Sequence, residues 1–186
     1  GSEMCIRDSN VGSPIYFVNT EASNPEIVEQ LEGSGFEQYV GPCAGFKLLY
    51  YAHKYGFNSD TEFVFYDFDK DSVDFKRDML LTWDGKDYEA WVDAWCKANP
   101  GKNLELQSLV SERWPTVIQQ FGGPSAWMDF WQRFQQCNWH VEHCDIIKDE
   151  LELKSVRTFF WTSNIYSYLP VKLSLIHISE PTRHCT

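Results

Sequence analysis

The spacing of apolar residues changes repeatedly along the first half of the chain. Short apolar runs, typical of buried strands, occur at Ile15–Val18, Phe36–Val40 and Thr61–Tyr66. Apolar positions three or four residues apart, typical of helices, occur over 24–32, Phe46–Tyr55 and Lys70–Thr82. This alternation predicts an α/β fold in which crossover helices connect the strands of a parallel sheet.

The second half begins with a long helical pattern over 83–136, a range rich in Trp. Four aromatic residues share one face of its last helix: Trp127, Phe130, Trp131 and Phe134. Such a stripe either packs into the core or forms a wall or lid over a substrate. We interpret 83–136 as a Trp-rich helical insertion, after which strands resume at Trp139–Cys144 and Val156–Trp161.

The charge balance narrows the classes of partner. The chain has 16 Lys and Arg against 27 Asp and Glu, a formal net charge of −11. Neutralising a nucleic-acid backbone requires a basic face, so this balance argues against a nucleic-acid partner. No run is long and apolar enough to span a bilayer, which argues against a membrane partner.

The codons that can encode the two ends of the chain indicate that these ends have a different origin from the rest of the protein. Met4–Asp8 can be written ATG TGT ATA AGA GAC, and this DNA extended by AG has the reverse complement CTG TCT CTT ATA CAC AT. The complement translates as Leu-Ser-Leu-Ile-His-Ile, the sequence of 173–178. One short DNA element, read on opposite strands, can therefore encode both ends, and it resembles the transposase adapter of shotgun sequencing libraries. We expect 1–9 and 173–186 to be adapter sequence and 10–172 to be an incomplete domain.

The cysteines outside the predicted adapters form no dense, regular framework. Their spacing favours reduced thiols and a cytoplasmic protein: Cys43, Cys96, Cys137 and Cys144. A metal set is also conceivable from Cys137, His140, His143 and Cys144. However, side chains alternate along a strand, so His143 faces away from His140 and Cys144, and we expect no metal there.

Polar or glycine-bearing segments follow three of the predicted strands directly: Gly41–Gly45, Asp67 and Asp145. Ligands of open parallel sheets bind outside the carboxyl ends of the strands, where the strand order switches. A carboxylate at the second strand can accept two hydrogen bonds from the vicinal hydroxyls of a ribose. A glycine loop lets the backbone approach a ligand closely, and Asp145 is suited to accept from an exocyclic adenine amine.

These segments resemble, in the same order, those of the class I S-adenosylmethionine-dependent methyltransferases. Asp67–Arg77 is similar to the segment after that family's second strand, where a turn and a helix ending in a basic residue follow an acid. Val141–Ile146 resembles the third-strand segment, which ends in an Asp beside the adenine. Phe159–Leu169 resembles the fourth strand and the apolar turn beyond it. The resemblance covers about 36–169.

The resemblance implies a Rossmann-like fold, S-adenosylmethionine as cofactor, and methyl transfer to an unidentified small-molecule or protein acceptor. Asp67 would bind the ribose hydroxyls, Asp145 and Ile146 would flank the adenine, and Gly41–Gly45 would lie under the methionine. The implied cofactor-binding residues are Gly41, Cys43, Ala44, Gly45, Asp67, Phe68, Asp145, Ile146 and Ser163. The fold also implies parallel strands near Phe65, Val141 and Phe159, with the strand of Val40 between those of Phe65 and Phe159.

Two other functions fit parts of the pattern. A nicotinamide-dependent oxidoreductase needs Gly-x-Gly-x-x-Gly to admit a pyrophosphate. Here Gly41 and Gly45 lie four residues apart and Pro42 has no N–H to offer a phosphate, which favours a cofactor without phosphate. The second hypothesis, ahead of the oxidoreductase, is a non-catalytic Rossmann-like module that binds a partner through its Trp-rich range.

Overall fold

The structure is a computed structural model that describes residues 15–18, 33, 35–102, 107–146 and 148–162. The predicted helix over 24–32 and both predicted adapter segments lie outside these residues. The described elements, in chain order, are β1 (Gln38–Pro42), α2 (Lys47–Tyr55), β2 (Glu62–Asp67), α3 (Lys70–Thr82), α4 (Tyr88–Ala98), α5 (Gln107–Gln120), α6 (Pro124–Phe134), β3 (Asn138–His143) and β4 (Thr158–Phe160).

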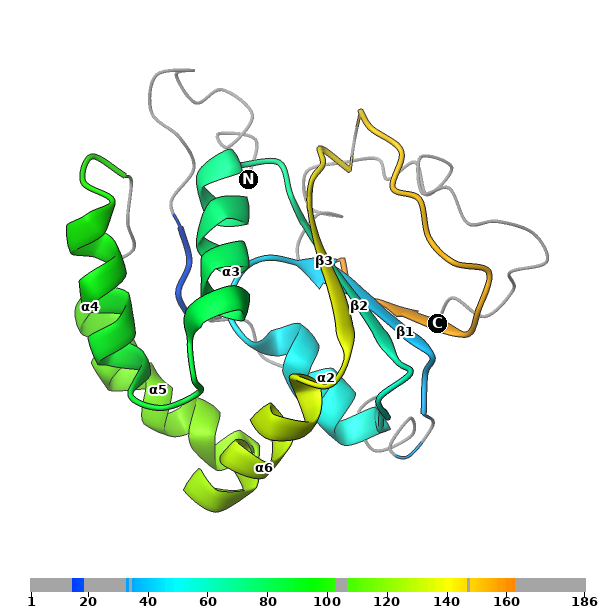
Figure 1. Cartoon of the computed structure of the whole chain (residues 1–186), viewed down its shortest axis with the longest axis horizontal. Coiled ribbons are helices and arrows are strands. Elements are labelled where there is room, and N and C mark those ends of the chain that lie inside the picture. Colours follow the sequence, from blue (N-terminus) through cyan, green and yellow to red (C-terminus); the bar gives the residue numbers. More distant parts are fainter. Residues whose placement is uncertain (1–14, 19–32, 34, 103–106, 147, 163–186) are drawn as a thin grey trace.

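The four strands form one parallel sheet in the order β3-β2-β1-β4 (Figure 1). Gln38 of β1 lies opposite Glu62 of β2 on one side and Thr158 of β4 on the other, and β2 pairs in turn with β3. This confirms the predicted α/β fold and the predicted place of the Val40 strand. The chain moves outward from β1 to β3 and then returns to the far side of β1, so the strand order switches between β1 and β4.

Alternate side chains of the central strands enter two separate cores. Tyr39 and Phe63 point into the larger core, which they share with the helices. Val40 and Val64 point into a smaller core closed by Leu153, from the segment between β3 and β4. Since successive strand residues face opposite sides of a sheet, α2 and α3 cover one face and this segment covers the other (Figure 1).

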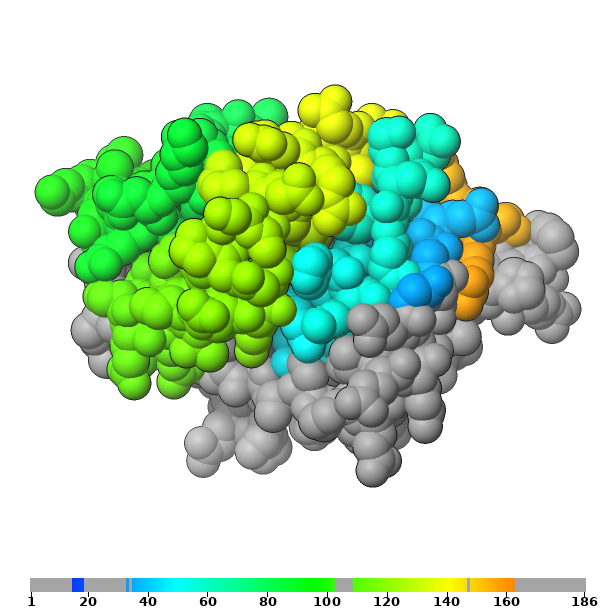
Figure 2. Space-filling model, turned by 90° about the horizontal axis from the view of Figure 1, so that it is seen from below, coloured from blue at the N-terminus to red at the C-terminus, as the bar shows by residue number. Residues whose placement is uncertain are grey.

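The aromatic stripe of α6 belongs to the larger core. Phe134 at its end packs on Phe63 at the start of β2, with ring centroids 4.9 Å apart. Figure 2, viewed from below, shows the yellow-green surface of α6 beside the cyan surface of α2. All four stripe residues are at most 1% exposed: Trp127, Phe130, Trp131 and Phe134. The stripe therefore fills the core near the amino ends of the strands, which favours the core interpretation over a substrate wall.

The predicted strand at Ile15–Val18 is wrong, although its apolar side chains are buried as expected. Its backbone bonds to side chains and loops instead of a full ladder. Tyr88 Oη donates to the carbonyl of Phe17 at 2.8 Å, and the N–H of Gly45 donates to the carbonyl of Tyr16 at 3.3 Å. The segment thus lies against the helices and the loop after β1.

The predicted loop Gly41–Gly45 also needs a correction, because β1 includes Gly41 and Pro42. The N–H of Cys43 donates to Tyr66 of β2 at 2.9 Å, so by alternation the Pro42 nitrogen faces the β4 side. The described β4 ends at Phe160, opposite Val40, and needs no donor from Pro42. A proline is therefore tolerated at the end of a central strand.

A buried glutamine joins β1 to β4. The Nε2 of Gln38 donates to Thr158 Oγ1 at 2.8 Å and to the carbonyl of Lys154 at 3.3 Å, while its Oε1 accepts from the Lys154 N–H at 3.2 Å. Both Gln38 and Thr158 are at most 1% exposed. These bonds fix the register of the two strands between which the order switches.

Among the described residues, no helix has the length and apolar character that crossing a bilayer requires.

Candidate functional site

The carboxyl ends of β1, β2 and β3 lie together at one edge of the sheet. The N–H of Cys43, after β1, donates to Tyr66 of β2, and the N–H of Cys144, after β3, donates to the carbonyl of Asp67 at 2.8 Å. These bonds bring the loop after β1, Asp67 and the segment of Asp145 to the same edge. The sequence prediction placed these three segments there, and Asp67 lies one strand away from the switch between β1 and β4.

Asp67, the last residue of β2, is partly buried at the centre of this edge. Its Oδ1 accepts from the Asp69 N–H at 3.0 Å, and the backbone N–H of Phe68 also stabilises the carboxylate. Burial raises the pKa of Asp67 to about 7, and the backbone hydrogen bonds from Asp69 and Phe68 only partly oppose this effect. The carboxylate can therefore change protonation state near neutral pH, a property common at functional sites.

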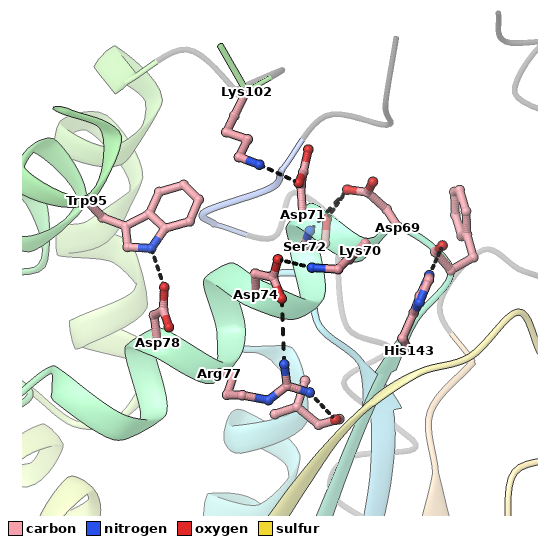
Figure 3. A network of polar contacts seen from close by, with 12 residues as sticks. Asp69, Lys70, Asp71, Ser72, Asp74, Arg77, Asp78, Trp95, Lys102 and His143 are labelled. Carbon is pink, nitrogen blue, oxygen red and sulfur yellow. Dashed lines mark hydrogen bonds and ion pairs between the residues drawn. The ribbon is translucent and has the colours of Figure 1, made fainter. Parts of the chain in front are cut away.

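The acids that follow Asp67 have structural partners. Asp69 is the N-cap of α3, where its Oδ2 accepts from the backbone N–H of Ser72 at 3.1 Å and from its hydroxyl at 2.9 Å (Figure 3). Asp71 pairs with Lys102, beyond α4, at 2.8 Å. Because Asp69 caps the helix, Asp67 is left without the ordinary role of an acid at a helix N-terminus.

Two contacts tie the end of β3 to the neighbouring elements (Figure 3). The His143 Nε2 lies 2.9 Å from the carbonyl oxygen of Phe68, so the proton of the ring must be on Nε2, because a carbonyl only accepts. Arg77 of α3 donates to the carbonyl of Val141 at 2.9 Å. The turn after β2 is thereby held while the Phe68 side chain stays 50% exposed at the edge.

Lys76 of α3 lies in the interior beneath the loop after β1 and is only 1% exposed. Its Nζ donates to the carbonyl of Gly45 at 2.8 Å and lies 5.6 Å and 5.3 Å from the ring centroids of Phe46 and Phe65. Burial lowers the pKa of Lys76 to about 8, while the charges of Cys43 and Asp67 act in the opposite direction. An ammonium group is thus enclosed directly below the candidate site.

The loop after β1 offers backbone and shape but no reactive group. The Cys43 side chain is buried, and burial, with the charge of Asp67 second, raises the pKa of its thiol well above the ordinary value. Since the thiolate is the reactive form of cysteine, nucleophilic catalysis by Cys43 is disfavoured. A Cβ on Gly41 would lie 3.1 Å from Leu48 and 3.2 Å from Trp161, so close packing of these two side chains of the larger core explains this glycine.

The third predicted segment forms a turn. Asp145 accepts at its carbonyl from the N–H groups of Lys148 and Asp149, and its own N–H donates to the Asp149 carboxylate at 2.9 Å. Ile146 packs partly buried against the smaller core. Both residues lie two strands from β1. Ser163, predicted to line the site after β4, lies outside the described residues.

Neither a family model, nor a curated protein, nor a solved structure matches the chain. A functional conclusion therefore has to come from the chemistry of the edge itself.

The described part of the chain holds no group of three or more His, Cys, Asp or Glu side chains arranged around a common point. Of the set considered from the sequence, Cys137 and Cys144 are buried, whereas His140 and His143 are exposed on β3.

A cavity of about 370 Å³ lies at the opposite edge of the sheet, next to the starts of β1 and β2. Phe36, Glu37, Tyr55, Asp60 and Thr61 are among the residues that line it. No predicted cofactor residue lines this cavity. Because ligands of parallel sheets bind at the carboxyl edge, we place the candidate site there and not in this cavity.

Sequence reasoning missed Lys76 and the contact of His143 with Phe68. A signal for Lys76 was present, because Val73, Met79 and Leu80 lie three or four residues from it and mark the apolar face of α3. A charged residue on that face must be buried with partners. The contact of His143 with a backbone carbonyl has no signature in the sequence.

Proposed function

We propose that the carboxyl edge of the sheet binds S-adenosylmethionine and that the protein transfers its methyl group to a small-molecule or protein acceptor. In this proposal Asp67 accepts hydrogen bonds from the ribose hydroxyls. Phe68, Asp145 and Ile146 flank the adenine, and the loop ending at Gly45 lies under the methionine.

The observation that carries the proposal is the position of the Asp67 carboxylate at the carboxyl edge of the sheet, one strand away from the strand-order switch. Asp67 ends the strand that pairs with β1, and its carboxylate accepts from the backbone N–H groups of Asp69 and Phe68. A ribose presents two adjacent hydroxyl donors, which match the remaining acceptor positions of this carboxylate. Hydrogen bonds to a charged carboxylate also offset the burial that raises its pKa to about 7.

The surroundings agree with an adenosyl ligand. Phe68 presents an aromatic side chain, 50% exposed, directly after the acid, and an aromatic face can stack on a purine. The loop after β1 contains no lysine or arginine, and the Lys76 ammonium beneath it is enclosed. These features favour a cofactor with a ribose and a base but without a pyrophosphate.

The decisive experiment is a calorimetric titration of S-adenosylhomocysteine into the 186-residue protein and two variants. Asp67→Ala removes the proposed ribose acceptor. Asp71→Ala is the matched control, because Asp71 lies four residues away and pairs with Lys102 instead. We expect saturable binding by the wild type and by Asp71→Ala, with affinity at least about tenfold lower in Asp67→Ala, the loss of about 1.4 kcal/mol of hydrogen bonding to a charged group.

Equal affinity in Asp67→Ala and the wild type would refute the assigned role of Asp67. A protein that is folded by circular dichroism yet binds no S-adenosylhomocysteine would refute the proposal as a whole. The favoured function would then be that of a non-catalytic module that binds a partner. A cytoplasmic location is also proposed, because the described cysteines form no disulfide.

A further inference from the structure

The outer edge of β3 offers backbone groups to another strand. In the described sheet β3 is outermost and pairs with β2 on its inner side. The N–H of Cys144 donates to Asp67 of β2, so alternate residues of β3 direct their backbone groups to β2. The residues between them, Trp139, Val141 and His143, direct theirs outward. Within the described part of the chain, the N–H groups of these three residues have no hydrogen-bond acceptor.

This edge is accessible along most of its length. His140, Glu142 and His143 are exposed, whereas the Val141 side chain is buried in the larger core. Arg77 donates to the Val141 carbonyl from α3, which covers one face of the sheet (Figure 3). A carbonyl oxygen can accept two hydrogen bonds, so this contact leaves its second acceptor position. An exposed edge strand of this kind is a template for pairing with another chain.

The sequence of β3 is complementary to itself in one antiparallel register. When Val141 lies opposite Val141 of a second copy, the two residues exchange both hydrogen bonds of a hydrogen-bonded pair. His140 then lies opposite Glu142 of the other copy, and the twofold symmetry forms this pair twice. The two pairs occupy non-hydrogen-bonded positions, where opposite side chains approach most closely. There an imidazole N–H can donate to a carboxylate.

The neighbouring registers lack this match. Outward-directed residues of one copy pair with outward-directed residues of the other, so the register changes in steps of two residues. One step brings Glu142 opposite Glu142 of the second copy, and like charges directly opposite are destabilising. A step the other way brings His140 opposite His140 and leaves both imidazoles without a carboxylate. The edge therefore selects the register centred on Val141.

We propose that the outer edge of β3 is a docking surface for the same edge of a second copy of this chain, antiparallel about Val141 with His140 opposite Glu142. The sheets of the two copies would then continue into each other. This pairing goes beyond the proposed function and does not depend on it. A strand of six residues offers a small interface, and each chain carries a formal net charge of −11, so we expect weak association at high protein concentration.

Sedimentation velocity over a concentration series of the 186-residue protein measures this association. We expect a monomer–dimer equilibrium in the wild type. Glu142→Lys places an ammonium group opposite His140, and His140→Glu places two carboxylates opposite each other. Each variant alone should therefore dimerise at least about tenfold more weakly than the wild type. An equal mixture of the two should associate again, because the introduced lysine faces the introduced glutamate and His140 faces Glu142.

The matched control is Glu112→Lys, which makes the same change of charge at an exposed position of α5, a helix that packs on α4 and α6. We expect this control to dimerise as the wild type does. A wild type that stays monomeric at its highest soluble concentration would overturn the proposal. So would a mixture of the two β3 variants that associates no better than each variant alone, a result that would also cover misfolding of either.

Amide hydrogen exchange followed by NMR, at low and high protein concentration, tests the backbone contact directly. The N–H groups of Trp139, Val141 and His143 should exchange more slowly at high concentration. The N–H of Glu142, directed to β2 within the sheet, should exchange equally at both concentrations. A dimer in which the three outward N–H groups gain no protection would have its interface elsewhere, and the proposal would be wrong.

Discussion

Asp67→Asn is expected to stabilise the folded protein relative to the wild type, and the gain is expected to grow as the pH rises. The ordinary pKa of an Asp is 3.8, and burial raises that of Asp67 to about 7 in the folded protein. The folded state therefore holds its proton more tightly than the unfolded state. Between these two values the unfolded chain loses the proton first, so the wild type loses stability as the pH rises through this window.

The size of the effect follows from the two pKa values. At pH 7.5 the penalty for the ionised carboxylate is about 4 kcal/mol, and at pH 4.5 it is about 1 kcal/mol. Asn cannot ionise, and its amide oxygen can still accept from the N–H of Asp69. The free energy of unfolding of Asp67→Asn should therefore exceed that of the wild type by about 3 kcal/mol more at pH 7.5 than at pH 4.5.

Urea denaturation followed by Trp fluorescence, at half-unit pH intervals from 4.5 to 7.5, measures this difference. All other titrating groups are common to the two proteins, so most of their contributions cancel at each pH. Asp71→Asn serves as control, and we expect its difference from the wild type to stay nearly constant with pH. A wild-type-to-Asp67→Asn difference that does not change across this range would refute the raised pKa and the burial argument behind it.

Four further substitutions, one of them a control, test the packing and hydrogen bonds by urea denaturation. Gly85→Ala should lower the free energy of unfolding by about 3 kcal/mol, because Gly85 has φ +87° and an added Cβ would lie 2.3 Å from Trp131. The control Gly101→Ala, at φ +81° with nothing within 4 Å of the added Cβ, should lower it by only about 1 kcal/mol. Equal losses in the two variants would contradict the clash with Trp131. Gln38→Leu should cost about 2 kcal/mol, since it removes three hydrogen bonds on the β4 side; a neutral result would remove this side chain from the β1–β4 contact. Asp78→Ala should lower the free energy of unfolding by about 1.5 kcal/mol, because the Asp78 carboxylate accepts from the indole N–H of Trp95 at 2.9 Å. An unchanged denaturation midpoint would show that water replaces this acceptor.

The sheet was predictable because both relevant patterns were strong. The aromatic run Thr61–Tyr66 and the apolar run that ends at Val40 form the two central strands, shifted by one or two residues from the prediction. Helix α3 begins and ends where the sequence indicated, because Asp69 supplies a side-chain cap. The run Ile15–Val18 carried the same apolar signal as a strand but is bound by Tyr88 and the loop after β1. Burial was predictable there, and the hydrogen-bond partner was not.

The candidate site was predictable in position and less so in detail. Strand-end placement brought Asp67 and Gly45 to one edge, since parallel strands end on the same side. The sequence could not tell which acid caps α3, because Asp67 and Asp69 both precede it, and only the structure assigns the cap to Asp69. The sequence also did not directly predict the burial of Lys76, because the depth of this charged side chain depends on the packing of three elements around it.

The pairing of β1 with β4 has a consequence for synthesis of the protein on the ribosome. Gln38 of β1 and Thr158 of β4 are 120 residues apart. At typical translation rates, about 6 to 24 s pass between their emergence. During that time β1 can pair with β2 but presents its other edge, with the amide of Gln38 and unpaired backbone groups, to other nascent chains. The strand that becomes central in the finished sheet is therefore a temporary aggregation risk, and a chaperone that shields an extended segment would act there first.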